Sequence, residues 1–164
     1  MRFKLTSLWA FICLVFCTNG LFAQNTFQKT IGAEGEDIAN WVLEIPTGYI
    51  IAGQGSILNE APNACLLQLD LAGNILWQKR YGAGYHFNEV LNAGDGFIAL
   101  GESNAGASDV DIFLLRTDLT GNPVWSRRIG DSSTTDVATS LIAVPGGYLL
   151  SGILAPSGTL GFNT

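Results

Sequence analysis

The stretch WQKRYG at residues 77–82 occurs three times in this chain, each time slightly altered. FQKTIG precedes it at 27–32, and WSRRIG follows it at 125–130. The start-to-start spacings are 77 − 27 = 50 and 125 − 77 = 48 residues. Self-similarity at this period is typical of stacked repeats, because one supersecondary unit buries its apolar face only against a neighbour. The sequence therefore predicts one repeat domain over residues 24–164, with units at 27–76, 77–124 and a truncated 125–164.

Each unit carries the same strand pattern, namely TGYIIAG at 47–53, DGFIALG at 95–101 and GGYLLSG at 146–152. An aromatic residue, three mostly apolar residues and a closing glycine, entered through a tight turn, predict a short buried strand. In two of the units another apolar run lies a few turn residues upstream, WVLEI at 41–45 and SLIAV at 140–144. Two strands joined by so few residues form a hairpin.

The second half of each unit is more regular still. LLQLDLAGNILW at 66–77 returns as LLRTDLTGNPVW at 114–125, without an insertion. An Asp at a turn start accepts backbone N–H groups, and a Gly three residues later adopts the positive φ that a short hairpin loop needs. The pairs are Asp70 with Gly73 and Asp118 with Gly121. A second hairpin is therefore expected in each unit.

Four short strands in about 50 residues, with an aromatic residue at a fixed place, are typical of a β-propeller blade. The sequence predicts an all-β fold of propeller-type repeats, with about two and a half to three four-stranded antiparallel blades in an incomplete propeller. One blade alone leaves its faces exposed, so we expect Trp77 and Trp125 to pack between neighbouring blades. Phe27 is expected to do the same in the first unit.

The runs at 66–77 and 114–125, which share an Asp, a Gly and a Trp, resemble the tryptophan-containing repeat of quinoprotein-like propellers. They are more similar to the Asp-x-x-Gly-Asn-x-x-Trp repeat arrays of secreted bacterial proteins, over residues 27–164. The resemblance implies a propeller fold; on the quinoprotein side it also implies a dehydrogenase whose quinone and calcium are held by residues from many blades. The chain departs from the quinoprotein pattern, because its Asp-to-Gly interval is three residues and not four. Thr120 keeps the threonine of that pattern, whereas Ala72 does not.

The first 23 residues have the features of a secretory signal peptide. Two basic residues precede an apolar core at 8–16, and Ala23 is the expected cleavage position. The apolar core is shorter than the roughly 20 residues that span a bilayer. A lipid-anchored alternative would use Cys17, although Phe16 stands where a lipoprotein signal has a small residue. We expect an exported chain that is secreted, periplasmic or held at the cell surface, without a transmembrane segment once processed.

The processed chain is acidic and has a single cysteine. Removal of Arg2 and Lys4 leaves 8 − 2 = 6 basic residues against 14 acidic ones, a net charge of 6 − 14 = −8. Nucleic-acid binding needs clustered Lys and Arg, so this balance argues against it. Cys65 then has no partner for an intrachain disulfide, and packing must stabilise one modest core of 164 − 23 = 141 residues.

Basic residues recur at one strand position of the three units, at Lys29, at Lys79 and Arg80, and at Arg127 and Arg128. Such a column would present a cationic stripe to an acidic glycan. The interpretation we favour is a solvated outer strand, since charged residues on exposed strands also prevent aggregation.

Asp109 and Asp111 have the spacing often found among oxygen ligands of calcium, just before an apolar strand. Their counterparts in the first unit are Ala61 and Asn63, so a polar strand start is the favoured interpretation. The recurring Asp37 and Asp136 are interpreted in the same way, as residues that build each turn and strand start.

The remaining candidates have simple structural interpretations. His86 is the only histidine and has no repeated partner, so it is expected in a solvated loop. Cys65 aligns with Phe113 and is interpreted as an inert core thiol. The Ser/Thr run at 132–135 and the glycines at 82–84 form no known phosphate loop or nucleophile motif and are interpreted as connections.

Three functional hypotheses remain open. The favoured one is a non-catalytic binding or scaffold module of a larger secreted or cell-surface protein, with an unknown protein or glycan ligand. No catalytic, cofactor-binding or metal-binding residue is assigned and no cofactor is expected, since little titratable chemistry remains once the repeat positions are set aside. The alternative is a fragment of a propeller enzyme, a quinoprotein-like dehydrogenase or a hydrolase, with its site residues outside this chain. The third is a truncated, aggregating reading frame.

The third unit stops early in the repeat pattern. Thr164 stands 12 residues after the closing Gly152, where Cys65 and Phe113 stand in the other units (65 − 53 = 113 − 101 = 12). About three blades are fewer than the four to eight that propellers usually have, so the outer faces of the terminal units would remain exposed to solvent. We expect the missing blades to come from downstream sequence or from other copies of the chain.

Overall fold

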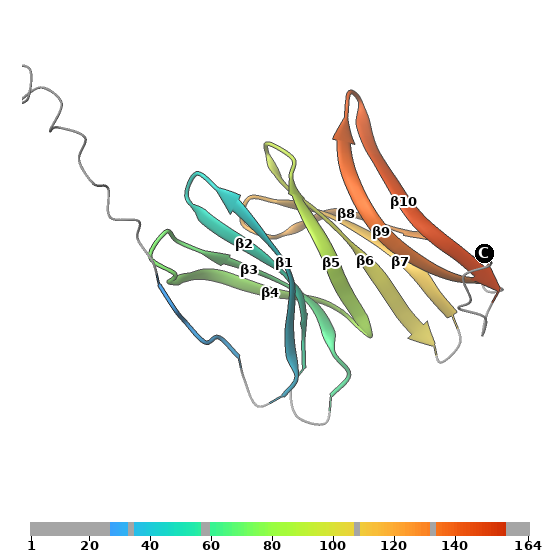
Figure 1. The fold of residues 1–164 in the computed structure, drawn as a ribbon, viewed down its shortest axis with the longest axis horizontal. Helices are drawn as coiled ribbons and strands as arrows, with labels where there is room; N and C mark the ends of the chain where they lie inside the picture. Colours follow the sequence, from blue (N-terminus) through green and yellow to red (C-terminus); the bar gives the residue numbers. More distant parts are fainter. Residues whose placement is uncertain (1–26, 33–34, 57–59, 107–108, 132–133, 157–164) are drawn as a thin grey trace, which may run out of the picture.

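The computed structural model describes residues 27–32, 35–56, 60–106, 109–131 and 134–156 (Figure 1). The predicted signal peptide at 1–23 lies outside these residues. Every helix or strand in the described ranges is a β-strand, so the predicted all-β class is confirmed. No helix in these ranges is long and apolar enough to cross a membrane.

The described ranges contain ten strands, which follow the predicted hairpins. They are β1 (Asp37–Ile45), β2 (Gly48–Gly55), β3 (Asn63–Leu69), β4 (Ile75–Ala83), β5 (Tyr85–Asn92), β6 (Gly96–Gly106), β7 (Asp109–Asp118), β8 (Pro123–Ile129), β9 (Thr134–Val144) and β10 (Gly147–Pro156).

These strands make three successive units, which from here on are counted by sheet and so begin at β1, β5 and β9, later than the units of the sequence pattern. The first unit is the antiparallel sheet β1–β4, and the second is the antiparallel run β5–β8. The third is the hairpin β9–β10, joined to the second by one parallel bridge between Val110 and Thr135. Figure 1 shows the first unit at one end of the stack and the third at the other. Within the described residues, the units do not close into a barrel or ring.

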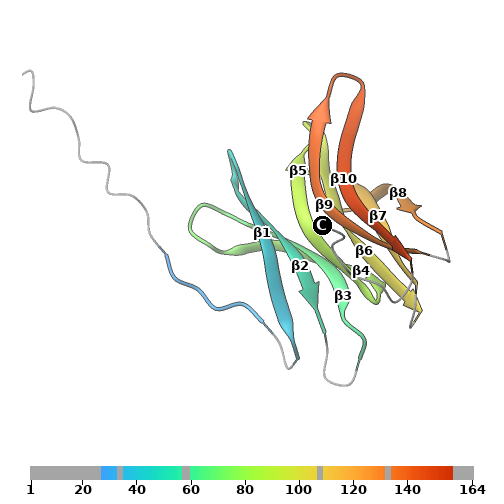
Figure 2. The same cartoon turned by 45° about the vertical axis from the view of Figure 1, so that its right-hand side comes forward.

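The first strands of the three units lie side by side. β1 contacts β5 and β5 contacts β9, and the turned view in Figure 2 shows β5 beside β9. Each of these strands also carries a β-bulge at the same repeat position, because one residue is skipped in its pairing with the next strand. The skipped residues are Asn40, Asn88 and Thr139.

The bulges explain the glycine that recurs in the strand pattern. The sequence pattern treats this glycine as the end of a strand, whereas β2 runs on to Gly55 and β6 to Gly106. A side chain at Gly53 would collide with the carbonyl of Ile38, and one at Gly101 with that of His86. The glycine therefore lies inside the strand, where the bulged neighbour approaches too closely for a Cβ.

The second hairpins form through the predicted Asp turns. Asp118 Oδ1 accepts the backbone N–H groups of Thr120 at 2.9 Å and Asn122 at 2.8 Å, and the turn at Asp70 repeats this pattern. Gly73 and Gly121 have φ of 79° and 76°, the left-handed region that favours glycine. Local side-chain chemistry therefore sets both turns.

Two hydrophobic cores hold the units together. One lies between the first and second units and includes Ile50, Leu66, Phe87 and Phe97. The other joins the second unit to the third and includes Ile98, Leu114 and Leu141. Each core is built from residues of adjacent units, as stacked repeats require.

The FQKTIG segment differs from its two repeats. Its equivalents end in β4 and β8, which pair with β3 and β7, whereas residues 27–32 form no strand. The repeat pattern makes this segment the equivalent of a fourth strand, and that interpretation is wrong for residues 27–32. The physical reason is that the described residues include no third strand upstream of residue 27 to which its backbone could bond.

The predicted packing of Trp77 between repeats agrees with the structure, whereas Phe27 lies on a turn of the first unit and is 42% exposed, so its predicted place between two blades is wrong. A Cβ at Gly73 would lie 2.6 Å from the Phe27 ring, and a Cβ at Gly121 would lie 2.9 Å from the Trp77 ring. Trp77 belongs to the first unit and packs on the turn of the second, and it also lies 6.3 Å from Phe97. Trp125, at the same position one unit later, is 37% exposed, so its predicted packing between blades is wrong; the described residues of the third unit include only β9 and β10 and hold no second-hairpin turn for it to cover.

Candidate functional site

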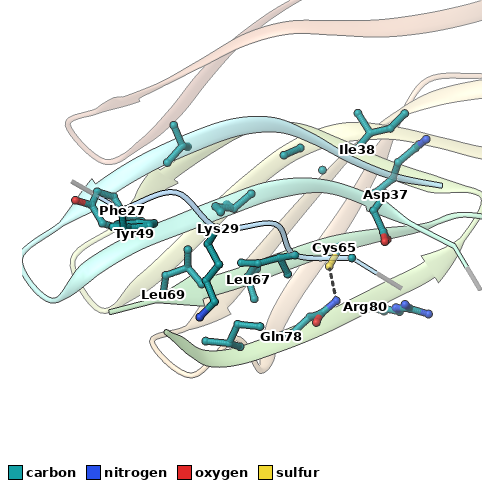
Figure 3. A pocket seen from close by; sticks show the side chains of 18 residues that line it. Phe27, Lys29, Asp37, Ile38, Tyr49, Cys65, Leu67, Leu69, Gln78 and Arg80 are labelled. Atoms are coloured by element: carbon teal, nitrogen blue, oxygen red, sulfur yellow. Dashed lines mark hydrogen bonds between the residues drawn. The ribbon is translucent and has the colours of Figure 1, made fainter. Parts of the chain in front are cut away.

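A groove of about 750 Å³ lies on the free face of the first unit, the face turned away from the second unit. Its walls come from all four strands of that unit and from residues 27–32, which cross over it (Figure 3). Its apolar lining includes Phe27, Val42, Tyr49, Ile51, Leu67 and Ile75. A concave, largely apolar surface of this size is the kind of place where proteins bind ligands or other protein surfaces.

Polar groups in the groove lining include Lys29, Asp37, Gln78 and Arg80. Two members of the predicted basic column, Lys29 and Arg80, therefore line one cavity (Figure 3).

The other placed members of the basic column have protein partners. Lys79 Nζ donates to the side-chain oxygen of Asn122, and Arg128 pairs with Asp111. Arg127 is exposed on β8. The members of the basic column therefore lie in different environments.

Cys65 lies half-buried in the groove and is not enclosed in the core. Burial raises the pKa of its thiol above the ordinary value, although the Gln78 side chain, which donates to Sγ at 3.7 Å, opposes that shift. The thiol is therefore held mainly in its protonated, poorly nucleophilic form at neutral pH. The predicted core position of Cys65 is therefore wrong, because the residue lines an open groove, and its inertness stays a prediction.

The groove face has equivalents that are covered in the rest of the chain. Repeat positions are offset by 101 − 53 = 48 residues from the first unit to the second and by 152 − 101 = 51 to the third. Val42 of the groove is thus equivalent to Val90 and Leu141. Val42 is 63% exposed, whereas Val90 and Leu141 are 0% and 1% exposed, each packed against the preceding unit. Within the described residues, this face is exposed to solvent in the first unit and buried in the other two.

The third unit shows the opposite face to solvent. Leu149 is 60% exposed, whereas its equivalents Ile50 and Ile98 are 0% exposed, each packed against the following unit. Ile142 and Val144 beside it are also exposed. The two ends of the stack therefore carry complementary faces of one repeated interface.

A polar cluster fastens the second unit to the third. Glu102 Oε1 accepts the backbone N–H of Ala138 at 3.0 Å, and Glu89 Oε2 accepts that of Leu141 at 2.8 Å. Both carboxylates are buried, and Glu102 also accepts from Asn88. Buried carboxylates are tolerated when they are hydrogen-bonded in this way.

His86 belongs to the same polar cluster. It pairs with Glu102 and lies in β5, where the sequence predicts a solvated loop; that placement is wrong. The Gly- and aromatic-rich surroundings of His86 are typical of a connection, whereas β5 pairs with β6 from Tyr85 to Asn92, apart from the bulged Asn88.

Two aspartates converge where the second unit meets the third. Asp111 on β7 and Asp136 on β9 both approach Gly130 so closely that a side chain there would collide with both carboxylates. Asp136 Oδ2 accepts from Thr134 Oγ1 at 3.0 Å and from the backbone N–H of Asp131 at 3.3 Å, which agrees with its predicted turn role. No cluster of three or more His, Cys, Asp or Glu suited to a metal occurs in the described ranges.

Some sequence candidates fall elsewhere. Residues 132–133 and the side chain of Asp109 lie outside the described part of the chain, so the predicted Asp109–Asp111 pair is placed only at Asp111. Gly84, with φ of 75°, forms the connection between β4 and β5, as the sequence predicts, whereas Gly82, with φ of 60°, lies within β4.

The groove and the Glu102 cluster are the features that sequence reasoning missed. The signal for the groove is present in the repeat alignment, because Val42, Val90 and Leu141 are all aliphatic at one position. The Glu102 cluster has no such signal. The equivalents of Glu102 in the other units are Gln54 and Ile153, so this carboxylate does not repeat, although Asn88 recurs as Asn40.

Comparison of the chain with models of known protein families, and with curated proteins, found no match.

Proposed function

We propose that this chain is an exported, non-catalytic repeat scaffold whose units are blades of the β-propeller type. In this proposal the chain acts by binding, through the open faces of its terminal units, as part of a larger secreted or cell-surface assembly. Export rests on the signal-peptide features of residues 1–23. The scaffold role rests on how the units pack.

The observation that carries the proposal is the repeated use of one interface. Val90 and Leu141 occupy the same position in successive units, and each is buried against the unit before it. Adjacent first strands, antiparallel meanders and an aromatic residue packed on the next unit's turn recur together, as they do in propeller blades. The Val42 face is the same surface without its neighbour, which supports binding of an apolar protein surface there.

The repeat character is tested by adding a unit. A second copy of residues 83–130, which is 130 − 83 + 1 = 48 residues and carries β5–β8, is inserted after Gly130. In a stack of blades each unit contacts only its neighbours, so the enlarged chain is expected to fold. Its urea unfolding should remain cooperative, with a larger dependence on denaturant because more surface is buried.

The matched control inserts the same 48 residues in shuffled order at the same site. It has the same composition and length but lacks the strand pattern, so it should add disordered chain and leave the denaturant dependence near its original value. Loss of folded structure in the ordered duplication would refute a modular stack of blades.

The catalytic alternative is tested separately on the purified full chain. The chain is incubated with pyrroloquinoline quinone and calcium, dialysed, and assayed with alcohols and sugars and a dye acceptor. A scaffold is expected to retain no quinone and to reduce no dye. Retained quinone absorbance with substrate-dependent dye reduction would overturn the non-catalytic assignment.

A further inference from the structure

The two ends of the stack carry the two halves of one interface. Neither half is covered by another unit in the described part of the chain, although residues 27–32 lie across part of the groove half. The groove face of the first unit is the surface that the second and third units bury against the unit before them. The outer face of the third unit is the surface that the first and second units bury against the unit after them. A second copy of this chain therefore carries the counterpart of each open face.

We propose that copies of this chain associate head to tail, with the β9–β10 hairpin of one copy docked in the groove of the next. This inference rests on the proposed scaffold function and names the partner of its groove. The structure assigns the contact because Val90 shares a core with Ile50, and Leu141 shares a core with Ile98. By the same repeat positions, Val42 of one copy meets Leu149 of another.

The residues around these two positions fit the same arrangement. Tyr49, Ile51 and Leu67 of the groove are equivalent to Phe97, Ala99 and Leu115, all of which lie in the core between the first and second units. On the opposite end, the exposed Val144 is equivalent to the buried Ile45. Both surfaces thus carry apolar residues at positions that the internal junctions use, although Leu66 of β3 and Leu114 of β7, which also enter those junctions, have no counterpart among the described residues of the third unit.

The interface is heterologous, because it joins two different surfaces. Such contacts produce closed rings when the rotation between copies closes, and open chains of copies when it does not. Either outcome makes the association depend on protein concentration. It also means that blocking one face in a copy leaves its other face free to bind.

The test measures the mass of the purified full chain by light scattering and sedimentation over a range of concentrations. The unchanged chain is expected to form dimers or larger assemblies. Val42→Lys blocks the groove and Leu149→Lys blocks the outer face of the third unit, and each change places a charge in the apolar contact. Each is expected to weaken association on the order of 100-fold, as loss of a central interface residue does.

The matched control is Val124→Lys. Val124 is 63% exposed, like Val42, but it lies on β8 away from both faces. It should associate like the unchanged chain. All three changes are at exposed positions, and circular dichroism and urea unfolding check that each variant remains folded. Ile38→Lys in the groove and Ile142→Lys on the third unit replace either test variant that fails this check.

The decisive measurement mixes the two blocked variants. Val42→Lys keeps an intact third-unit face, and Leu149→Lys keeps an intact groove, so the mixture is expected to form a one-to-one dimer while each alone is monomeric. Dimers of Leu149→Lys alone would indicate groove-to-groove pairing and overturn the inference. A folded full chain that stays monomeric at all concentrations would also overturn it.

Failure here is distinguishable from failure of the proposed function. A monomeric chain whose duplicated-unit variant still folds would refute self-association and leave the repeat scaffold standing. An unfolded duplication in a chain that nevertheless associates would refute the scaffold. The two experiments therefore report on separate statements.

Discussion

Glu102 of the second unit accepts the backbone N–H of Ala138 in the third unit, with 3.0 Å between Oε1 and N. The residue is 3% exposed, so its carboxylate has little contact with water. It is stabilised instead by Asn88, which donates to both oxygens at 2.9 and 3.0 Å, and by His86. A single carboxylate therefore joins two strands of its own unit to the first strand of the next.

We expect Glu102→Ala to destabilise the chain by about 3 kcal/mol, because it leaves the Ala138 N–H and the Asn88 amide buried without this acceptor. The loss should concentrate in β9 and β10, since Glu102 is one of two carboxylates that hold β9. Urea unfolding measures the total, and hydrogen exchange measures the Ala138 amide.

Glu44→Ala is the control, because Glu44 is an exposed carboxylate on β1. It should change stability by no more than about 0.5 kcal/mol, the usual range for surface substitutions. Equal effects of the two substitutions, with unchanged exchange at Ala138, would show that Glu102 does not fasten the third unit.

The turn at Asp118 predicts an acid-sensitive step in stability. Hydrogen bonds from Asn122, followed by those from Thr120, lower the pKa of Asp118 from 3.8 to about 2. Because the folded pKa is depressed, this stabilisation is present above pH 3.8 and is lost as the pH falls through about 2. The melting temperature of Asp118→Asn should therefore fall less than that of the unchanged chain between these pH values.

Asp70→Asn provides the comparison for the Asp118 result. Hydrogen bonds from Asn74 also lower the pKa of Asp70, but Ala72 stands where Thr120 offers a hydroxyl. Replacing Asp70 should consequently reduce the fall in melting temperature at acid pH by less than replacing Asp118 does. Melting curves at closely spaced pH values decide this, and identical acid limbs for Asp118→Asn and the unchanged chain would contradict the prediction.

The parts of the fold that depend on local chemistry were predictable. The Asp70 and Asp118 turns follow from side-chain hydrogen bonds within four residues, and the hairpins follow from short apolar runs. The bulges at Asn40 and Asn88 were not predictable, because a bulge depends on the register between two strands. The recurring glycine is a consequence of that register, but the sequence pattern is equally consistent with a glycine at the end of a strand.

The candidate site also has one part that could be predicted from the sequence and one part that could not. The groove follows from repetition, since Val42 can be aligned with Val90 and Leu141, and only the packing of whole units reveals which copy is uncovered. The Glu102 cluster depends on contacts between residues 36 positions apart, 138 − 102, that occur in one unit only. A pattern that does not repeat leaves no trace in a repeat alignment.

Cys65 should react slowly with alkylating agents. Burial raises the pKa of its thiol, so the thiolate fraction at neutral pH is small. We expect iodoacetamide to modify it more than about tenfold more slowly in the folded chain than in urea. Mass spectrometry of the Cys65 peptide measures this rate without interference from Cys13 and Cys17.

Gln78→Leu provides a second test of the thiol. Donation by Gln78 to the sulfur favours the thiolate, so its removal should raise the pKa of Cys65 further and slow alkylation again. Faster alkylation in this variant would show that Gln78 acts by covering the thiol and not by polarising it. Head-to-tail association should slow the reaction as well, since Cys65 lines the groove.

Gly130 is the position at which an added methyl group should be most damaging at the junction of the second and third units. Its φ is 153°, and a Cβ would collide with Asp111 and Asp136. Gly130→Ala is expected to cost about 3 kcal/mol in urea unfolding. Gly147→Ala is the control, because no atom lies within 4 Å of its Cβ position; it should be neutral or slightly stabilising.

A double substitution tests whether the carboxylates cause the Gly130 effect. Asp136→Ala alone should destabilise the chain, because Asp136 accepts from Thr134 and from the Asp131 backbone. If the collision with Asp136 accounts for much of the cost at Gly130, then Gly130→Ala with Asp136→Ala should cost less than the sum of the two single changes. Strict additivity in urea unfolding would leave Asp111 and the backbone conformation of Gly130 as the causes.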